Sequence, residues 1–263
     1  MASKVALVKT DKGVEEAYGQ ALELIGGIND LDYETRDVTV KVGIYDARNL
    51  NYPTILVVGA VVNSFSHARR IFLAESDNHQ GKALDRLQVW KDNFSDKVAP
   101  FDLSHDPNLR DVQVCGEKLQ FSHVLFKPNV LVSLHVLREG TTGSIFKNLL
   151  GLVPDTRKER FHNELGVALI DMVEAVGGID LAVIDGTYAY GGEWKEGEPM
   201  EKKRRDLIIV GRDAVAVDSV GVILVGGNPL DIPAIVEAKN RGLGESDINS
   251  IEVVGEALDD CKI

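Results

Sequence analysis

Residues that suit the binding of an anion are concentrated in the segment 139–162, EGTTGSIFKNLLGLVPDTRKERFH. Ser and Thr precede an apolar run there, which is typical of a helix N-terminus, where backbone N–H groups without intrahelical partners attract negative charge. A glycine lets the backbone come close to a ligand, and basic residues follow. The ligand-binding residues predicted in this segment are Thr141, Thr142, Gly143, Ser144, Lys147, Asn148, Arg157, Lys158 and His162. A capped surface helix followed by a solvated basic turn would give the same pattern.

Three carboxylates and a histidine elsewhere in the chain are candidates for proton transfer or metal binding. Carboxylate oxygens suit divalent cations, and carboxylates and imidazoles suit acid–base catalysis. The predicted metal ligands are Glu75, Asp77 and Asp185, and the predicted catalytic groups are Asp185, His135 and Glu75. Each has a structural alternative. Asp185 would then be a turn residue that bonds the backbone, the other two carboxylates would lie in a solvated loop, and His135 would be a structural histidine.

Short apolar runs alternate along the chain with amphipathic helical patterns. This alternation predicts an α/β fold, a largely parallel sheet with helices on both faces. The predicted strands are 5–8, 37–44, 71–74, 124–126, 181–184, 207–210 and 251–254, with a hairpin insertion at 112–121. The predicted helices are 14–25, 53–65, 84–90, 165–176, 214–225 and 231–239, the last capped by Asp231. We expect a single domain over 1–263, with 81–122 as a candidate insertion.

Polar residues follow several of the predicted strands. Glu75, Asp185 and Arg212 with Asp213 stand at such positions, and Lys127 and Asn129 follow the run 124–126. Ligands of open α/β sheets bind beyond the carboxyl ends of the strands. We therefore expect these side chains to converge on one rim, with Lys127 and Asn129 among the ligand-binding residues.

The segment 187–200 is rich in glycine and predicts a mobile loop. It carries Tyr188, Tyr190 and Trp194. These aromatic residues would either close over a ligand as a lid or pack the loop onto the domain.

The composition excludes several classes of function. The net charge is −12, with no basic tail, which argues against nucleic acid or an anionic membrane surface as a partner. The only cysteines, Cys115 and Cys261, are too few for this chain alone to hold an iron–sulfur cluster. No apolar stretch has the length of a membrane span, and we expect a cytoplasmic protein with reduced thiols. The usual motifs of serine hydrolases, zinc proteases, P-loop NTPases and dinucleotide-binding proteins are absent from the sequence.

Five ordered motifs resemble those of the "domain of unknown function 362" family. They are Ala74-Glu75-Ser76; Thr141-Thr142-Gly143 through Lys147-Asn148-Leu149 and Gly151 to Arg157-Lys158 and Phe161-His162; Ile184-Asp185-Gly186; Val210-Gly211-Arg212-Asp213-Ala214-Val215-Ala216-Val217-Asp218; and Gly242-Leu243-Gly244. The chain departs from the family at Lys41-Val42-Gly43-Ile44, where relatives tend to carry Lys-Pro-Asn, and at Ser133-Leu134-His135, where they tend to carry Lys-Thr-His. Longer relatives append a ferredoxin-like iron–sulfur module, so the resemblance implies an external redox partner.

Two functions follow as hypotheses. The first is a cytosolic enzyme that acts on a small anionic metabolite or cofactor, carboxylated or phosphorylated, with a divalent metal or a redox partner as further candidates. The second is a non-catalytic protein that carries a cofactor or docks on a redox enzyme. A pocket lined mainly by backbone groups, with Asp185 held in a local turn bond, would favour the second. The identity of any cofactor and assembly into a homo-oligomer stay open.

Overall fold

The computed structural model describes residues 3–140 and 142–262. Within them, eight strands form one sheet and two strands form a separate hairpin. The order across the main sheet is β10 (Ile251–Gly255), β1 (Ser3–Lys9), β9 (Glu201–Gly211), β8 (Leu181–Gly191), β7 (Val130–Arg138), β2 (Asp37–Val42), β3 (Arg70–Glu75) and β4 (Val98–Asp102). The hairpin, predicted from the run 112–121, consists of β5 (Leu109–Val114) and β6 (Glu117–Ser122).

The main sheet is largely parallel, as the sequence predicts. Only β9 runs against its neighbours, β1 and β8, and every other adjacent pair is parallel. The reversal follows from the connection between β8 and β9, which is the short loop 192–200 rather than a helix. A parallel neighbour needs a long crossover, whereas an antiparallel neighbour can be reached by a direct turn.

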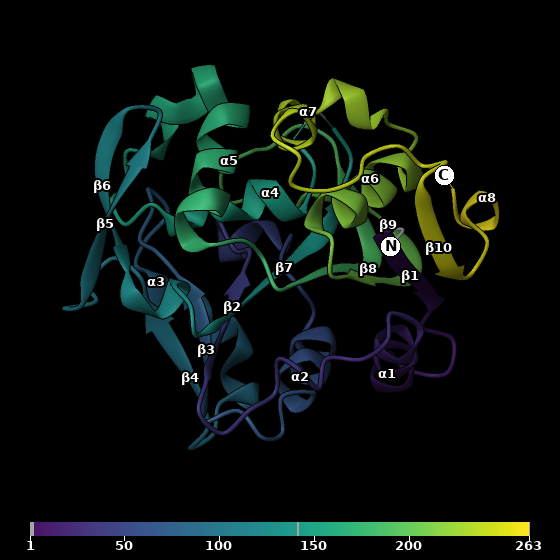
Figure 1. The fold of residues 1–263 in the computed structure, drawn as a ribbon, viewed down its shortest axis with the longest axis horizontal. Helices are drawn as coiled ribbons and strands as arrows, with labels where there is room; N and C mark the ends of the chain where they lie inside the picture. The colour runs from purple at the N-terminus through teal and green to yellow at the C-terminus, as the bar shows by residue number, and fades with distance from the viewer. Residues whose placement is uncertain (1–2, 141, 263) are drawn as a thin grey trace.

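Helices cover both faces of the sheet, which confirms the predicted α/β architecture (Figure 1). In Figure 1, α1 and α2 lie below the sheet, and α4, α5, α6 and α7 lie above it. The α-helices are α1 (Val14–Leu24), α2 (Ile55–Asn63), α3 (Ala83–Leu87), α4 (Ile145–Asn148), α5 (Leu165–Val176), α6 (Ala214–Leu224), α7 (Pro233–Asn240) and α8 (Leu258–Cys261). The 3₁₀ turns are η1 (Ala47–Asn49), η2 (Gln88–Asn93), η3 (His123–Leu125), η4 (Leu149–Leu152), η5 (Lys158–Glu164) and η6 (Pro229–Asp231). None of the helices in these ranges is long and apolar enough to cross a membrane.

The buried strand β2 sends two kinds of side chain to its two faces. Val38, Val40 and Val42 belong to the apolar core between the sheet and the helices α1 and α2. Side chains alternate along a strand, so Thr39 and Lys41 point to the face covered by α4. Both are fully buried, and the alternation therefore places a lysine inside the protein on the side of α4.

The segment around Lys127 differs from the prediction. Residues 123–125 form the 3₁₀ turn η3, which Ser122 caps, and the strand is the longer apolar run β7 that follows. Lys127 and Asn129 therefore precede a parallel strand and lie at the edge opposite to its carboxyl end. Lys127 pairs there with Asp180, and the Asn129 amide donates to the carbonyl of Val124 at 3.4 Å.

Three further predictions are wrong in detail. Arg212 and Asp213 follow the antiparallel strand β9, so they also lie at the opposite edge, where Asp213 caps α6. The segment 187–200 is a loop only over 192–200, because β8 runs on to Gly191. The last predicted helix begins at Pro233 and is capped by Ile232 instead of Asp231.

Candidate functional site

A cavity of about 420 Å³ opens at the carboxyl ends of β2, β3 and β7. Its position agrees with the rule that ligands of α/β sheets bind at this edge. The side chains used below that line it are Tyr45, Glu75, His135, Arg138, Lys147, Asn148, Lys158, His162 and Trp194. Of the predicted site residues, the structure thus brings together those of β3, β7, α4 and η5.

A buried ionic network forms the floor beside this cavity. The Lys41 ammonium lies 3.1 Å from a carboxylate oxygen of Glu75, and both side chains are almost fully buried. A guanidinium nitrogen of Arg86 lies 3.9 Å from the same oxygen. Glu75 also accepts backbone hydrogen bonds from Ile44 at 3.3 Å and Ser76 at 3.0 Å. Burial lowers the pKa of Lys41, and the neighbouring carboxylate opposes that shift. The charge of Glu75 is therefore internally compensated.

Asn148 and Gly151, in the segment after β7, contact this ionic network directly. The Asn148 side chain accepts from Lys41 at 3.0 Å and donates to the Lys41 carbonyl at 2.7 Å. Gly151 packs directly against the ion pair, since a Cβ atom there would lie 2.3 Å from Glu75 Oε1. The absence of a side chain at position 151 is thus what lets η4 approach the paired charges.

Two cations in the cavity have no such compensation. Within residues 3–140 and 142–262, neither Arg138 nor Lys147 has an acidic partner or a side-chain hydrogen bond, and Arg138 Nε is buried without a partner. Burial and the nearby Arg138 lower the pKa of Lys147 to about 8. Burial also lowers the pKa of Arg138. Positive charge therefore accumulates at one end of the cavity, in a chain with a net charge of −12.

Two histidines and a second lysine face the same space. His135 is fully buried, and burial together with Arg138 holds its pKa well below the usual range, so its ring is neutral at pH 7. Its Nδ1 accepts from the backbone N–H of Val136 at 2.7 Å, which leaves the ring proton on Nε2. Burial and Lys147 lower the pKa of His162. Lys158, whose pKa burial lowers to about 8, donates to Ser76 Oγ and to the Asp77 carbonyl.

Aromatic side chains form another part of the cavity wall. Tyr45 and Trp194 pack edge to face with ring centroids 5.7 Å apart, and each is about two-fifths exposed, at 44% and 43%. The Trp194 indole donates to Asn49 Oδ1 at 3.0 Å, and the Asn49 carbonyl accepts from Met200 N–H at 2.9 Å. The loop 192–200 is therefore tied down at both ends, with Trp194 facing the cavity.

One of the backbone N–H groups expected to bind an external anion, that of Ser144, is already occupied, as are those of the two residues that follow it. Asp218, a fully buried residue of α6, accepts from Ser144 at 2.6 Å and from Ile145 and Phe146 at 3.1 Å each. Gly143 has a φ of 66°, and a Cβ atom there would lie 2.7 Å from Asp218 Oδ2. An internal carboxylate therefore holds the N–H group of Ser144, and a ligand on the backbone of Thr142 and Gly143 stays a prediction. Thr142 does not line the cavity, and Thr141 lies outside the described residues.

Asp185 is a turn residue whose carboxylate bonds backbone N–H groups, which is the structural alternative to a catalytic or metal-binding role. One carboxylate oxygen accepts from Thr187 N–H at 2.9 Å, a local turn bond, and the other accepts from Thr54 N–H at 2.6 Å, at the start of α2. Asp185 is 2% exposed and does not line the cavity. Arg157 does not line it either, and its side chain is 73% exposed.

The three predicted metal ligands do not form one group. Glu75 is paired with Lys41, Asp185 with backbone N–H groups, and Asp77 accepts from Ala83 N–H at 2.8 Å. Asp77 instead lies with Asp102 and His105, whose ligand atoms are within 4.8 Å of one another. His105 and Asp102 already pair at 2.8 Å. This second cluster is satisfied internally and gives no separate indication of a metal.

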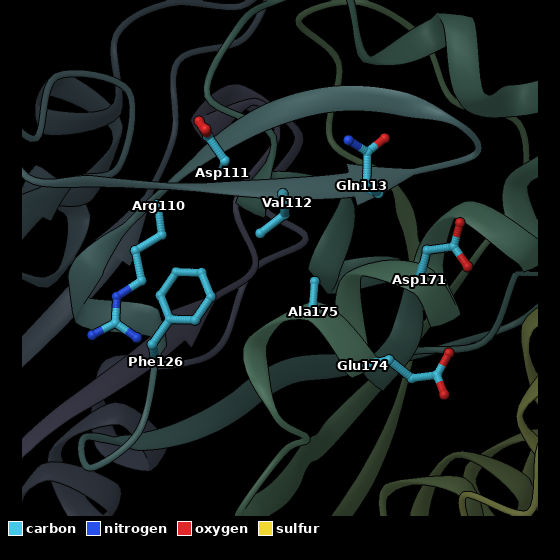
Figure 2. A pocket seen from close by; sticks show the side chains of 8 residues that line it. All are labelled: Arg110, Asp111, Val112, Gln113, Phe126, Asp171, Glu174 and Ala175. Carbon is cyan, nitrogen blue, oxygen red and sulfur yellow. The ribbon is translucent and has the colours of Figure 1, made fainter.

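Another hollow, of about 480 Å³, lies between the hairpin and α5 (Figure 2). Figure 2 shows Arg110 beside the ring of Phe126, and Asp171 and Glu174 on the helix. Arg110 lies 4.8 Å from that ring centroid, and Arg241 pairs with Asp171 at 2.7 Å and with Glu174 at 2.6 Å. The charged side chains of this second hollow thus have partners, in contrast to Arg138 and Lys147 in the first cavity.

Sequence reasoning missed Lys41, Arg86 and Arg138. Lys41 carried a signal, since a lysine between valines in the buried run DVTVKV has to be paired. Arg138 was missed with its strand, although the run VLVSLHVLR is longer and more apolar than 124–126. Arg86 comes from α3 and reaches Glu75 only through the tertiary fold.

Comparison with known proteins agrees with the motifs. The model of the family described as "Domain of unknown function (DUF362)" matches residues 38–223. The chain belongs to this family. The matched range runs from the second residue of β2 to the last but one residue of α6. It includes every cavity residue named above, whereas the motif at 242–244 lies outside it. No curated protein matches the chain.

Breaking the buried ion pair should destabilise the protein. Lys41→Met leaves Glu75 buried without its closest counter-charge, with Arg86 and Lys158 as more distant cations, and we expect a loss of about 3–5 kcal/mol in the free energy of unfolding. Lys41→Met with Glu75→Gln removes both charges and should lose less than the sum of the single variants. Denaturant unfolding measures all three, and additive losses would contradict the direct pairing.

The stability of the protein should depend on pH through Asp218. Burial raises its pKa to about 6, although three N–H donors oppose the shift. The native state then holds this proton more tightly than the unfolded chain, so the contribution of Asp218 to stability falls as pH rises from about 4 to about 6. Relative to Asp218→Asn, the wild-type free energy of unfolding should fall by about 3 kcal/mol over this range and stay level above pH 7. A difference that is constant from pH 4 to 7 would contradict the assignment.

Proposed function

We propose that the protein is an enzyme that binds a small anionic metabolite or cofactor in the cavity at the carboxyl ends of β2, β3 and β7. The observation that carries the proposal is the pair of cavity cations, Arg138 and Lys147, without an acidic partner among the described residues. Both residues are partly buried, and charged groups are seldom withdrawn from water without a counter-charge. A bound carboxylate or phosphate would supply it.

The surroundings of this pair favour an external anion. Glu75, a buried acidic residue of the cavity, already neutralises Lys41. Burial lowers the pKa values of Lys147 and His162, and a neighbouring cation lowers each of them further. Arginine can grip a carboxylate or phosphate with two parallel hydrogen bonds. We therefore place the anionic group of the ligand between Arg138 and Lys147, and not on the backbone of residues 142–144.

The rest of the cavity suggests the shape of the ligand. A volume of about 420 Å³ suits a metabolite or a compact cofactor. Tyr45 and Trp194 offer ring surfaces that suit a planar or apolar body. We expect a ligand with an anionic end at Arg138 and a flatter part beneath Trp194.

Catalysis would use the cavity side chains with unusual pKa values. His135 is neutral at pH 7 with a proton on Nε2, and Lys147 is partly neutral near pH 8. Groups tuned in this way suit proton transfer. A divalent metal and an external redox partner stay predictions, and the ion pairing of Glu75 supports neither.

A non-catalytic cofactor carrier is the second candidate. It is favoured by Asp185, one of the two predicted catalytic carboxylates, which is held in a local turn bond outside the cavity. Against it, the cavity is lined largely by ionisable and aromatic side chains. Turnover of the bound compound would separate the two candidates, because a carrier releases its ligand unchanged.

Removal of either cavity cation should weaken anion binding. Arg138→Gln or Lys147→Met each deletes a charged hydrogen-bond donor, worth about 1.5–3 kcal/mol, and should reduce the affinity for oxalate or inorganic phosphate by about 10–100-fold. Isothermal titration calorimetry measures the affinity. The control is Arg157→Gln, which removes an equal charge from the exposed surface beside the cavity. An equal loss in the control would show a nonspecific effect of net charge and contradict the site.

Anion binding should weaken in alkali. Lys147 and Lys158 have pKa values of about 8, and a lysine is charged below its pKa and neutral above it. The affinity for oxalate, which does not itself titrate between pH 6 and 10, should be highest below pH 8 and fall as pH rises through that value. An affinity that stays constant up to pH 10 would mean that these lysines do not bind the anion.

A further inference from the structure

We propose that Lys147 is the nucleophile of the site and forms an imine with a carbonyl group carried by the anionic ligand. This inference rests on the proposed function and adds the chemical class of the substrate, an aldehyde or ketone with a carboxylate or phosphate. It also assigns the cavity lysines different roles.

The hydrogen bonds of the cavity distinguish Lys147 from its neighbours. Lys41 Nζ lies 3.1 Å from Glu75 and donates to Asn148 and to the Val42 carbonyl. Lys158 Nζ donates to Ser76 Oγ at 2.5 Å and to the Asp77 carbonyl at 2.8 Å. In the described part of the chain, the Lys147 amine has no such partner, and it faces the cavity. Its lone pair is therefore accessible once the proton is lost.

The backbone around Lys147 keeps the amine in place. Lys147 lies on α4, whose first N–H groups are held by Asp218. The next residue, Asn148, is fixed by its bonds to Lys41 and to Ser133 Oγ at 3.1 Å. The side chain thus extends from a fixed base into a cavity that it shares with a second cation.

The electrostatic setting activates the amine. A lysine becomes nucleophilic at neutral pH when burial and another cation favour its neutral form, and Arg138 is that cation here. The same Arg138 would hold the anionic group of the ligand and so bring the carbonyl near Lys147.

The reaction balances without any further reagent. The neutral amine adds to the carbonyl carbon and forms a C–N bond, and a proton passes from nitrogen to oxygen to give a carbinolamine. The nitrogen then loses its remaining proton, and the C–O bond breaks to release water and leave the imine. His135 and His162 line the same cavity and are available to move these protons.

Reductive trapping tests the inference on the whole protein. The probe is pyridoxal 5′-phosphate, an aldehyde that carries a phosphate, followed by borohydride and peptide mass spectrometry. We expect labelling of Lys147 to exceed that of Lys158 by about tenfold or more, because Lys158 would have to give up two hydrogen bonds. Lys158 is a matched internal control, since both lysines have a pKa of about 8. Inorganic phosphate should compete with the labelling.

Two variants and a binding measurement separate the possible results. Lys147→Arg keeps a cation but cannot form an imine, so the adduct should disappear while phosphate affinity falls less than in Lys147→Met. Equal labelling of Lys147, Lys158 and surface lysines would overturn the imine. Phosphate binding to wild type without any trapped adduct at Lys147 would overturn the imine alone and leave the proposed function standing. Absence of both would overturn both.

Discussion

The buried contact between Lys41 and Glu75 is the interaction on which the cavity depends. Strand alternation forces Lys41 into the interior, and a lysine there requires a carboxylate. Glu75 supplies it from the end of β3, and Asn148 joins Lys41 to the segment that carries Lys147. Among the described residues that line the cavity, Glu75 is the only buried carboxylate, and because it pairs with Lys41, Arg138 and Lys147 are left for a ligand. The charges of Lys41 and Glu75 beside the cavity balance each other, whereas Arg138 and Lys147 have no acidic partner among the described residues.

Asp218 is a second internal carboxylate that satisfies polar groups near the cavity, in this case the first N–H groups of α4. A helix of four residues has little stability of its own, and its first N–H groups need an acceptor. The carboxylate from α6 provides one within the protein. Two internal carboxylates, Asp218 and Glu75, thus fix the two sides of the segment 143–151 that the sequence marks as central, and they explain Gly143 and Gly151 as places where a side chain would collide with them.

The sequence was sufficient for the architecture and for much of the cavity. Periodicity revealed most strands and helices, and the rule on carboxyl ends placed Glu75 at the right edge, whereas His135 was singled out only by its residue type. It failed where a choice depended on tertiary partners. The N–H group of Ser144 looked available because Asp218, 74 residues further along the sequence, binds it only in the folded chain. Lys127 and Asn129 were placed at the wrong edge because three apolar residues were interpreted as a strand, although they form a 3₁₀ turn. Arg138, the cation now central to the site, was missed together with β7.

The most direct test of the account is a crystal structure grown with an anion of high electron density, such as tungstate, at a concentration near its dissociation constant. The account predicts a peak between the Arg138 guanidinium and the Lys147 ammonium, inside the cavity, with Asp218 still bonded to the backbone of residues 144–146. A tungstate ion on those backbone N–H groups, or ions confined to exposed lysines and arginines while the cavity stays empty, would contradict the account.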